Sequence, residues 1–385
     1  MDLDAFRALL TPEGQILLKR ARQVYDAEGG DALRTVTVLR RDAAPEAAAV
    51  ALTQVELRKR AAAKLGSDLA DRMYFTPDGL EQATRRRVAE HRAARVSMAR
   101  PESVLDLGCG IGGDLVTFAR AGLTAAGVDH DPLRVEVARA NLAALDLGGA
   151  VQVAEAEELD VSGFGVVFAD PARRTSSGRV FDVGGWSPPW SFVERLLTRP
   201  SCVKVAPGIP HDLVPPGVEA EFVSDDGEVK EAALWSPARA TVIRSAGLAT
   251  LTEEDDPGDQ ALRGVGRYLY EPDGAVIRAG LVTAVSAGVG GGLVDPHIAY
   301  VTSDEAFSTP FARSYEVLEE LPYKEKALRA ALRERGVGRL TIKKRGVDVV
   351  PEELRKRLSL SGDEEATLVL TRVAGEGTAL LVRPF

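Results

Sequence analysis

The chain has 385 residues, of which 45% are hydrophobic and 27% charged, so it is long enough for two or three domains and too apolar to be disordered. Its net charge of −9 argues against a surface that is basic all over, and hence against indiscriminate nucleic-acid binding. Two cysteines and four scattered histidines exclude a disulfide framework and argue against a metal site, and no apolar run is long enough to span a membrane. We therefore expect a cytoplasmic protein without metal or membrane contact, whose oligomeric state the sequence does not indicate.

Residues 1–100 predict a helical N-terminal domain, because their apolar positions recur at helical spacing. Thr76 followed by Pro77 and an acidic residue is typical of a helix start. We expect this helix to continue through the arginines at 85–87 and to lead directly into the next domain.

Residues 101–250 predict a doubly wound, Rossmann-like α/β sheet, because short apolar strands alternate with helical stretches. The expected strands lie at 103–107, 124–129, 151–154, 166–170 and 201–206. Three further strands, at 218–223, 229–235 and 240–244, follow without long helices between them. The sheet is therefore expected to end in an antiparallel hairpin.

Residues 251–310 are interpreted as a connecting segment that contains a helix near 275–285, a glycine-rich stretch and a strand near 297–302. Residues 311–385 predict a small α+β domain. Its expected strands lie near 314–318, 339–343, 366–372 and 378–383, and its expected helices at 324–335 and 351–358.

A glycine-rich turn follows the first strand of the predicted sheet. Gly108, Gly110 and Gly113 have the spacing with which backbone amides approach a ligand at a helix N-terminus. Asp106 discriminates between ligands, since a fixed carboxylate there disfavours a dinucleotide pyrophosphate and suits a cation such as the ammonium of a methionine group. The turn therefore favours S-adenosylmethionine over NAD.

Asp129 ends the second predicted strand, where a carboxylate can accept hydrogen bonds from both ribose hydroxyls. His130 follows it and is expected at the surface beside the ribose. Asp131 precedes Pro132 and is interpreted first as a helix cap.

The end of the third strand is expected to contact the adenine of the cofactor. Glu155 is the first choice as acceptor for the exocyclic amine, with Ala156 beside it. Because Glu157 and Glu158 follow directly, a register shifted by two residues and a solvated acidic turn stay open as alternatives.

The fourth strand ends in Asp170-Pro171-Ala172-Arg173-Arg174, at the edge where ligands bind in such sheets. This resembles the motif of methyltransferases that act on exocyclic amines, in which Asp or Asn precedes two prolines and an aromatic residue. Asp170 and the Pro171 carbonyl would then hold the amine. Arg173 and Arg174 replace the stacking aromatic and would contact substrate phosphate or a base; a salt-bridged turn is the alternative.

With these motifs, the chain resembles a bacterial family of class I S-adenosylmethionine-dependent methyltransferases that have a THUMP-like C-terminal domain. The resemblance rests on residues 75–84 (FTPDGLEQAT), 168–174 (FADPARR), 340–346 (LTIKKRG) and 365–372 (EATLVLTR), which together span nearly the full length. THUMP domains in general bind RNA for an attached modifying enzyme, so the resemblance implies a transfer or ribosomal RNA substrate.

Two local basic clusters agree with an RNA partner, although each is equally compatible with a solvated helix face. They comprise Arg85, Arg86, Arg87, Arg92 and Arg95 in the first cluster, and Lys343, Lys344, Arg345, Arg355, Lys356 and Arg357 in the second. The alternatives are a methyltransferase for a small molecule or a protein, and a non-catalytic RNA-binding protein with a vestigial methyltransferase domain. An NAD oxidoreductase is disfavoured by Asp106.

Overall fold

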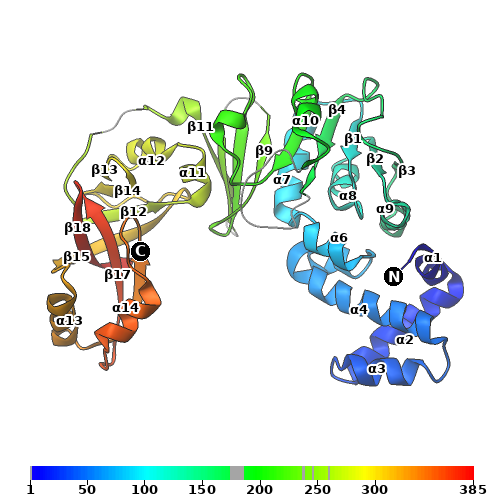
Figure 1. The fold of residues 1–385 in the computed structure, drawn as a ribbon, viewed down its shortest axis with the longest axis horizontal. Coiled ribbons are helices and arrows are strands. Elements are labelled where there is room, and N and C mark those ends of the chain that lie inside the picture. Colours follow the sequence, from blue (N-terminus) through cyan, green and yellow to red (C-terminus); the bar gives the residue numbers. More distant parts are fainter. Residues whose placement is uncertain (1, 174–185, 236–238, 245–246, 259–260) are drawn as a thin grey trace. The chain divides into compact units, whose positions relative to one another are not determined.

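The computed structural model describes residues 2–173, 186–235, 239–244, 247–258 and 261–385. The chain forms two compact units, Met1–Pro215 and Pro216–Phe385, which are described separately below (Figure 1). Among the described residues, no helix is both long and apolar enough to cross a membrane.

The first unit begins with a helical region, as the apolar spacing predicts. Side chains of Asp2, Thr11, Asp31 and Thr76 each accept a hydrogen bond from a backbone amide in the first turn of the helix that follows. The helices are α1 (Leu3–Leu10), α2 (Pro12–Ala27), α3 (Ala32–Leu39), α4 (Pro45–Leu65), α5 (Ser67–Ala70), α6 (Pro77–Gln82) and α7 (Arg86–Met98).

The helix predicted to run from Thr76 through the arginine cluster is in fact two helices, and this part of the prediction is wrong. The expected cap at Thr76 is present, but α6 ends at Gln82 and α7 begins at Arg86. Between them Thr84 is buried, and its hydroxyl donates to the Asp114 carboxylate over 2.9 Å. The local sequence favours one continuous helix here. The break between the two helices coincides with this tertiary hydrogen bond of Thr84.

The sheet of the first unit contains five parallel strands in the order β7-β4-β1-β2-β3. They are β1 (Val104–Leu107), β2 (Ala125–Asp129), β3 (Ala150–Val153), β4 (Val166–Ala169) and β7 (Ser201–Val205). The connecting helices are α8 (Gly113–Arg120), α9 (Pro132–Ala144) and α10 (Trp190–Leu196). Every residue of β1 and β4 is buried, as expected for strands of a parallel sheet covered on both faces.

A short ribbon follows β4 in the same unit. Strand β5 (Ala172–Arg173) pairs antiparallel with β6 (Trp186–Ser187). Because parallel strands present their carboxyl ends at one edge, the residues after β1, β2, β3, β4 and β7 lie along one edge of the sheet.

The second unit begins with the expected antiparallel hairpin. Strand β8 (Ala220–Asp225) pairs antiparallel with β9 (Glu228–Leu234). Strand β10 (Arg239–Arg244) pairs parallel with β8 and antiparallel with β11 (Gly247–Thr252). Helix α11 (Gly274–Arg278) packs on β8 and β10.

The rest of the second unit is built on a seven-stranded sheet in the order β13-β14-β12-β15-β18-β17-β16. Its strands are β12 (Tyr268–Pro272), β13 (Gly292–Asp295), β14 (Ile298–Ser303), β15 (Ala312–Leu321), β16 (Val337–Lys344), β17 (Glu364–Val373) and β18 (Glu376–Pro384). Its helices are α12 (Val282–Gly288), α13 (Glu325–Glu334) and α14 (Pro351–Leu358). Alternate residues of β17 enter two different core clusters, Leu368 and Leu370 in one and Val369 in the other, as the two-residue period of a strand requires.

Candidate active site

The glycine-rich turn after β1 has the backbone that a close approach to a ligand requires. Gly108, Gly110 and Gly112 adopt φ values of +75°, +54° and +81°, which strongly favour glycine. A Cβ placed on Gly108 or Gly110 would meet no described atom within 4 Å, whereas one on Gly112 would lie 3.1 Å from the Cβ of Ala138. Gly112 thus allows α9 to pack closely, and Gly108 and Gly110 leave the turn open. Gly113 begins α8.

Cys109 fills space inside this turn. Its side chain is buried, and a Cβ on Gly127 of β2 would lie 3.0 Å from its sulfur. Burial raises the pKa of the Cys109 thiol well above its usual range, and the nearby carboxyl groups of Asp106 and Asp129 raise it further. These properties are those of a small packing residue and not of a nucleophile.

Asp129 holds the turn and the start of α9 together. Its Oδ2 accepts the Gly110 amide over 3.0 Å, and its Oδ1 accepts the Asp131 amide over 2.9 Å. Asp131 is the cap of α9, as expected, because its Oδ1 accepts the Leu133 amide over 2.8 Å. The exposed His130 places Nδ1 3.5 Å from Asp129 Oδ1.

Asp106 is a buried carboxyl group near three other carboxyl groups. Burial raises its pKa well above the usual range, Asp114, Asp170 and Asp129 raise it further, and Arg92 lowers it. A concentration of negative charge around a buried carboxyl group disfavours an anionic ligand and stabilises a cationic one. The open glycine turn and this electrostatic environment therefore fit the ammonium and sulfonium groups of S-adenosylmethionine.

The third strand ends before the residues expected to contact adenine. Strand β3 ends at Val153, and the Ala154 amide donates to the Asp129 carbonyl over 3.1 Å. Glu155 is exposed and Ala156 is half-buried, within the turn that follows. Both residues thus lie beside the end of β2, at the edge of the sheet to which Asp129 belongs.

Asp170 follows β4 and faces a cation that the sequence motif does not include. Lys204, in β7, places Nζ 2.6 Å from Asp170 Oδ2 and 3.3 Å from Thr84 Oγ1. The Lys204 side chain is 17% exposed, whereas that of Asp170 is 34% exposed, so the carboxylate is the more accessible partner. Pro171 is buried beside it.

A series of polar contacts runs from Asp170 through Lys204 and Thr84 to Asp114. Arg92 lies at its far end. It is only 2% exposed, forms a close ion pair with Asp114 and lies with its guanidinium 4.6 Å from the centre of the Phe168 ring. Since Thr84 donates to the same Asp114 carboxylate, α7 and α8 are joined to the site by buried contacts. Arg92 is thus a structural residue of the site, although the sequence places it in a basic cluster.

Two buried amides hold the segment between α5 and α6, and one of them, Asn141 of α9, also links it to the glycine-rich turn. Gln54 accepts from the Phe75 amide over 3.0 Å and donates to the Phe75 carbonyl over 2.7 Å. Asn141 makes the same pair of contacts with Tyr74, over 2.6 and 3.0 Å, and also donates to the Ile111 carbonyl in the glycine-rich turn over 2.8 Å. The segment that leads to α6 is therefore held from both sides.

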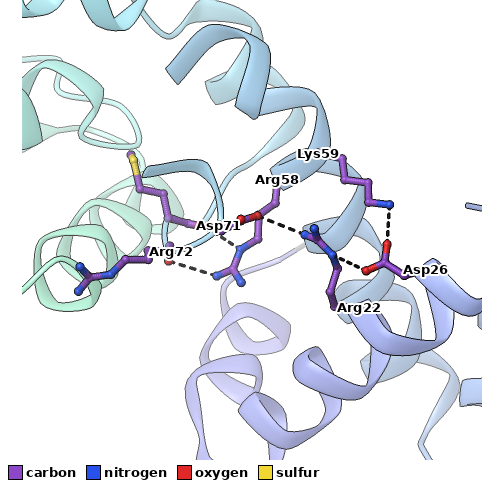
Figure 2. A network of polar contacts seen from close by, with 7 residues as sticks. Arg22, Asp26, Arg58, Lys59, Asp71 and Arg72 are labelled. Atoms are coloured by element: carbon purple, nitrogen blue, oxygen red, sulfur yellow. Dashed lines mark hydrogen bonds and ion pairs between the residues drawn. The ribbon is translucent and has the colours of Figure 1, made fainter. Parts of the chain in front are cut away.

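Charged side chains add further contacts within the helical region, and one of them reaches the end of α9. Figure 2 shows Arg58 of α4 donating to the backbone carbonyls of Arg72 and Met73, and Arg22 bridging Asp26 and Asp71. Arg72 in turn pairs with Asp146, just after α9, over 2.7 Å. These cations serve the fold of the helical region.

The second basic cluster, in the C-terminal part of the chain, is also partly engaged in the fold. Lys343 lies 2.9 Å from a Glu271 carboxylate oxygen, Arg355 donates to the Leu340 carbonyl, and Arg357 pairs with Glu325 over 2.9 Å. Arg345 lies with its guanidinium 5.7 Å from the centre of the Tyr300 ring, whereas Lys344 and Lys356 are exposed. Neither of these two lysines forms an ion pair with a residue that the structure describes.

Of the two arginines in the Asp170 motif, the structure describes one. Arg173 contributes its backbone to β5, opposite Trp186, and Arg174 lies outside the described residues. Within the described ranges, no group of three or more His, Cys, Asp or Glu side chains is arranged to hold a metal ion.

The structure also brings in residues that the sequence does not single out for this site. Asp114 directly follows Gly113, whereas Thr84 and Lys204 come from positions at least 30 residues away from their partners Asp114 and Asp170. Lys204 lies in the fifth predicted strand, near its end, and this position is the one signal that could have placed it next to Asp170.

Comparison with known protein families divides the chain into three matched regions. Residues 312–384 match a family described as THUMP domain-like, residues 104–173 match a methyltransferase domain, and residues 2–61 match a domain of unknown function.

Two proteins of Mycobacterium tuberculosis, from strains CDC 1551 / Oshkosh and ATCC 25618 / H37Rv, are similar over most of the chain. Each is 38% identical over 346 residues, which cover 85% of this chain and 95% of the relative, and each is named an uncharacterised S-adenosylmethionine-dependent methyltransferase. A crystal structure from Porphyromonas gingivalis W83, of a protein assigned as a methyltransferase, has the same fold with a TM-score of 0.77. It is 22% identical, and the match covers 96% of this chain and 98% of the other.

Proposed function

The chain belongs to a family of S-adenosylmethionine-dependent methyltransferases with a THUMP-like C-terminal domain, and from this premise we propose that it methylates an exocyclic amine of an RNA base. The RNA would be a transfer or ribosomal RNA. We further propose that the functional parts of the chain are residues 1–100, 101–250, 251–310 and 311–385.

The observation that supports amine methylation is that one oxygen of the Asp170 carboxylate is available as a hydrogen-bond acceptor. Oδ2 accepts a hydrogen bond from Lys204, whereas Oδ1 has no hydrogen-bond donor among the described residues. The side chain is 34% exposed and lies at the ligand-binding edge of the sheet. An available carboxylate oxygen can accept an N–H of an amine and orient its lone pair. The Pro171 carbonyl would accept the second N–H.

The cofactor would be held by the residues around the glycine-rich turn. Asp106 would face the ammonium of the methionine group, and the open backbone at Gly108 and Gly110 would approach the same part of the ligand, next to Gly113 at the start of α8. When bound, S-adenosylmethionine supplies an electrophilic methyl group on a positively charged sulfur.

The remaining contacts would come from the ends of the second and third strands. Asp129 would accept hydrogen bonds from the ribose hydroxyls, with His130 beside them at the surface. Glu155 and Ala156 would contact adenine. Arg173 and Arg174 would contact the substrate RNA.

An RNA substrate is supported by the THUMP domain-like match to residues 312–384 and by the exposed Lys344 and Lys356 within it. Phosphate contacts of this kind position an RNA without reading its sequence. The net charge of −9 limits the number of such contacts, so we expect binding that depends on RNA shape as well as charge.

Transfer of a labelled methyl group tests the proposal. The full chain would be incubated with methyl-labelled S-adenosylmethionine and extracts from a strain that lacks the gene, and the products would be treated with ribonuclease or protease. We expect label that only ribonuclease releases. Label released by protease, or found in small molecules, would replace the RNA substrate with one of those classes, and binding of RNA without any transfer would indicate a non-catalytic protein.

A further inference from the structure

Lys204 and Asp170 stand side by side because of strand register. Strands β4 and β7 are parallel neighbours in which Ala169 is opposite Val203. The next residues along the two strands are Asp170 and Lys204. Their side chains therefore leave the sheet at the same level and toward the same face. Their charged groups meet over 2.6 Å.

The ammonium of Lys204 is fixed by a second contact. Thr84 donates its hydroxyl proton to Asp114 over 2.9 Å, so its oxygen can accept from Lys204 over 3.3 Å. Asp114 in turn forms an ion pair with the buried Arg92. Positive and negative groups therefore alternate from Arg92 to Asp170, and each limits the rotation of the next.

The two oxygens of Asp170 differ as a result. Oδ2 is occupied by Lys204, and within the described part of the chain Oδ1 has no donor. A carboxylate that was free to rotate could present either oxygen in many directions. Held through Oδ2, it presents Oδ1 in one direction, which is what an acceptor for a reacting group requires.

We propose that Lys204 is a positioning residue, which holds the Asp170 carboxylate by Oδ2 so that Oδ1 accepts an N–H of the substrate amine. This inference rests on the proposed function. In the reaction, the nitrogen lone pair forms a bond to the methyl carbon while the carbon–sulfur bond breaks and its electron pair remains on sulfur. The methylated nitrogen then releases a proton to water, and S-adenosylhomocysteine leaves.

The test compares Lys204→Met with Lys204→Arg in the full chain, using the labelled-methyl assay with RNA from the gene-deletion strain. We expect Lys204→Met to lower kcat by about tenfold to a hundredfold, the range for losing a hydrogen bond to a charged group. The KM for S-adenosylmethionine and the calorimetric affinity for S-adenosylhomocysteine should stay within about twofold of wild type. Lys204→Arg, which keeps a cation and its donors, should recover most of kcat.

A matched control is Lys59→Met. Lys59 forms an ion pair of similar length, 2.7 Å, with Asp26, and both residues belong to the helical region (Figure 2). Its kcat should equal that of the wild type. If Lys204→Met does not fold, Lys204→Gln removes the charge and shortens the side chain while keeping it polar, and the same loss of kcat with unchanged S-adenosylhomocysteine affinity is expected.

A double-mutant cycle decides whether Lys204 acts through Asp170. Once Asp170→Ala has removed the carboxylate, adding Lys204→Met should change kcat by less than about threefold, because positioning requires the group that is positioned. Multiplicative losses in the double variant, an unchanged kcat in Lys204→Met, or equal losses of kcat and S-adenosylhomocysteine affinity would overturn the inference. Failure of the wild type itself to label RNA would instead overturn the proposed function from which the inference starts.

Discussion

Asp106, the proposed partner of the ammonium group of the cofactor, is a buried carboxyl group whose raised pKa opposes stability. Burial and the neighbouring Asp114, Asp170 and Asp129 raise its pKa in the folded protein, whereas Arg92 offsets this in part. Between the ordinary carboxyl pKa, about 4, and the raised value, the folded protein binds a proton that the unfolded chain has released. In that window the free energy of unfolding therefore falls as pH rises.

Asp106→Asn removes this titrating group at nearly constant size. We expect the midpoint of thermal unfolding to fall less between about pH 5 and 8 in the variant than in the wild type, and to be higher than wild type at the upper end. Affinity for S-adenosylhomocysteine should decrease in the same variant, because the proposed partner of the ammonium group is lost. Calorimetry and thermal unfolding over this pH range measure both effects. Identical pH dependence of stability in the two proteins would contradict a raised pKa of Asp106.

At the scale of elements, the side-chain amide of Asn141 in α9 links the helical region to the glycine-rich turn. Asn141 is fully buried and holds Tyr74 and Ile111 through three hydrogen bonds. Its loss would leave buried backbone groups without partners, each at a cost of about 1 to 3 kcal/mol.

Asn141→Ala should therefore lower the free energy of unfolding by about 3 kcal/mol. Because Ile111 belongs to the glycine-rich turn, the affinity for S-adenosylhomocysteine should fall as well. Chemical denaturation compares this variant with Gln23→Ala, which truncates an exposed amide on α2 and should change stability by less than about 0.5 kcal/mol. A stability loss equal to that of the control would show that the contacts of Asn141 are not needed.

The same contacts mark the limit of what the sequence predicts. Periodicity and glycine spacing are local signals, and they predict the strands around Asp106 and the cap at Thr76 correctly. The break at Thr84 and the approach of Lys204 to Asp170 depend on which strands become neighbours and which polar groups need partners once buried. The position of Lys204 near the end of a predicted strand indicates the ligand-binding edge, but no local pattern encodes its contact with Asp170 or the break at Thr84.

At the scale of the whole molecule, the sequence predicts the helical region, the Rossmann-like sheet and the C-terminal α+β domain, because each has its own periodicity. It does not predict that β12, β13 and β14, within residues 251–310, join the same sheet as β15. Strand pairing between segments that are distant in the chain has no local signature, and glycine-rich stretches resemble linkers.

The charges of the C-terminal domain allow a test of RNA binding. Lys344→Ala with Lys356→Ala should weaken RNA binding and reduce the dependence of log affinity on log salt by about 0.7 for each phosphate that the protein no longer neutralises. Arg339→Ala is the control, since Arg339 already forms an ion pair with Glu365. Fluorescence anisotropy at several salt concentrations measures the slopes. If neither the double lysine variant nor Arg339→Ala changes the slope, this surface does not contact phosphate.

The most direct test of amine methylation in RNA is mass spectrometry of nucleosides from a strain that lacks the gene. Complementing genes would encode either the wild type or Asp170→Ala. We expect one base-methylated nucleoside, with the methyl on an exocyclic nitrogen, to be missing from the deletion strain, to return with the wild type, and to stay at least about a hundredfold reduced with Asp170→Ala. Binding of S-adenosylhomocysteine by this variant should be retained. An unchanged set of RNA nucleosides in the deletion strain would contradict RNA methylation by this protein, and full restoration by Asp170→Ala would contradict the role of Asp170.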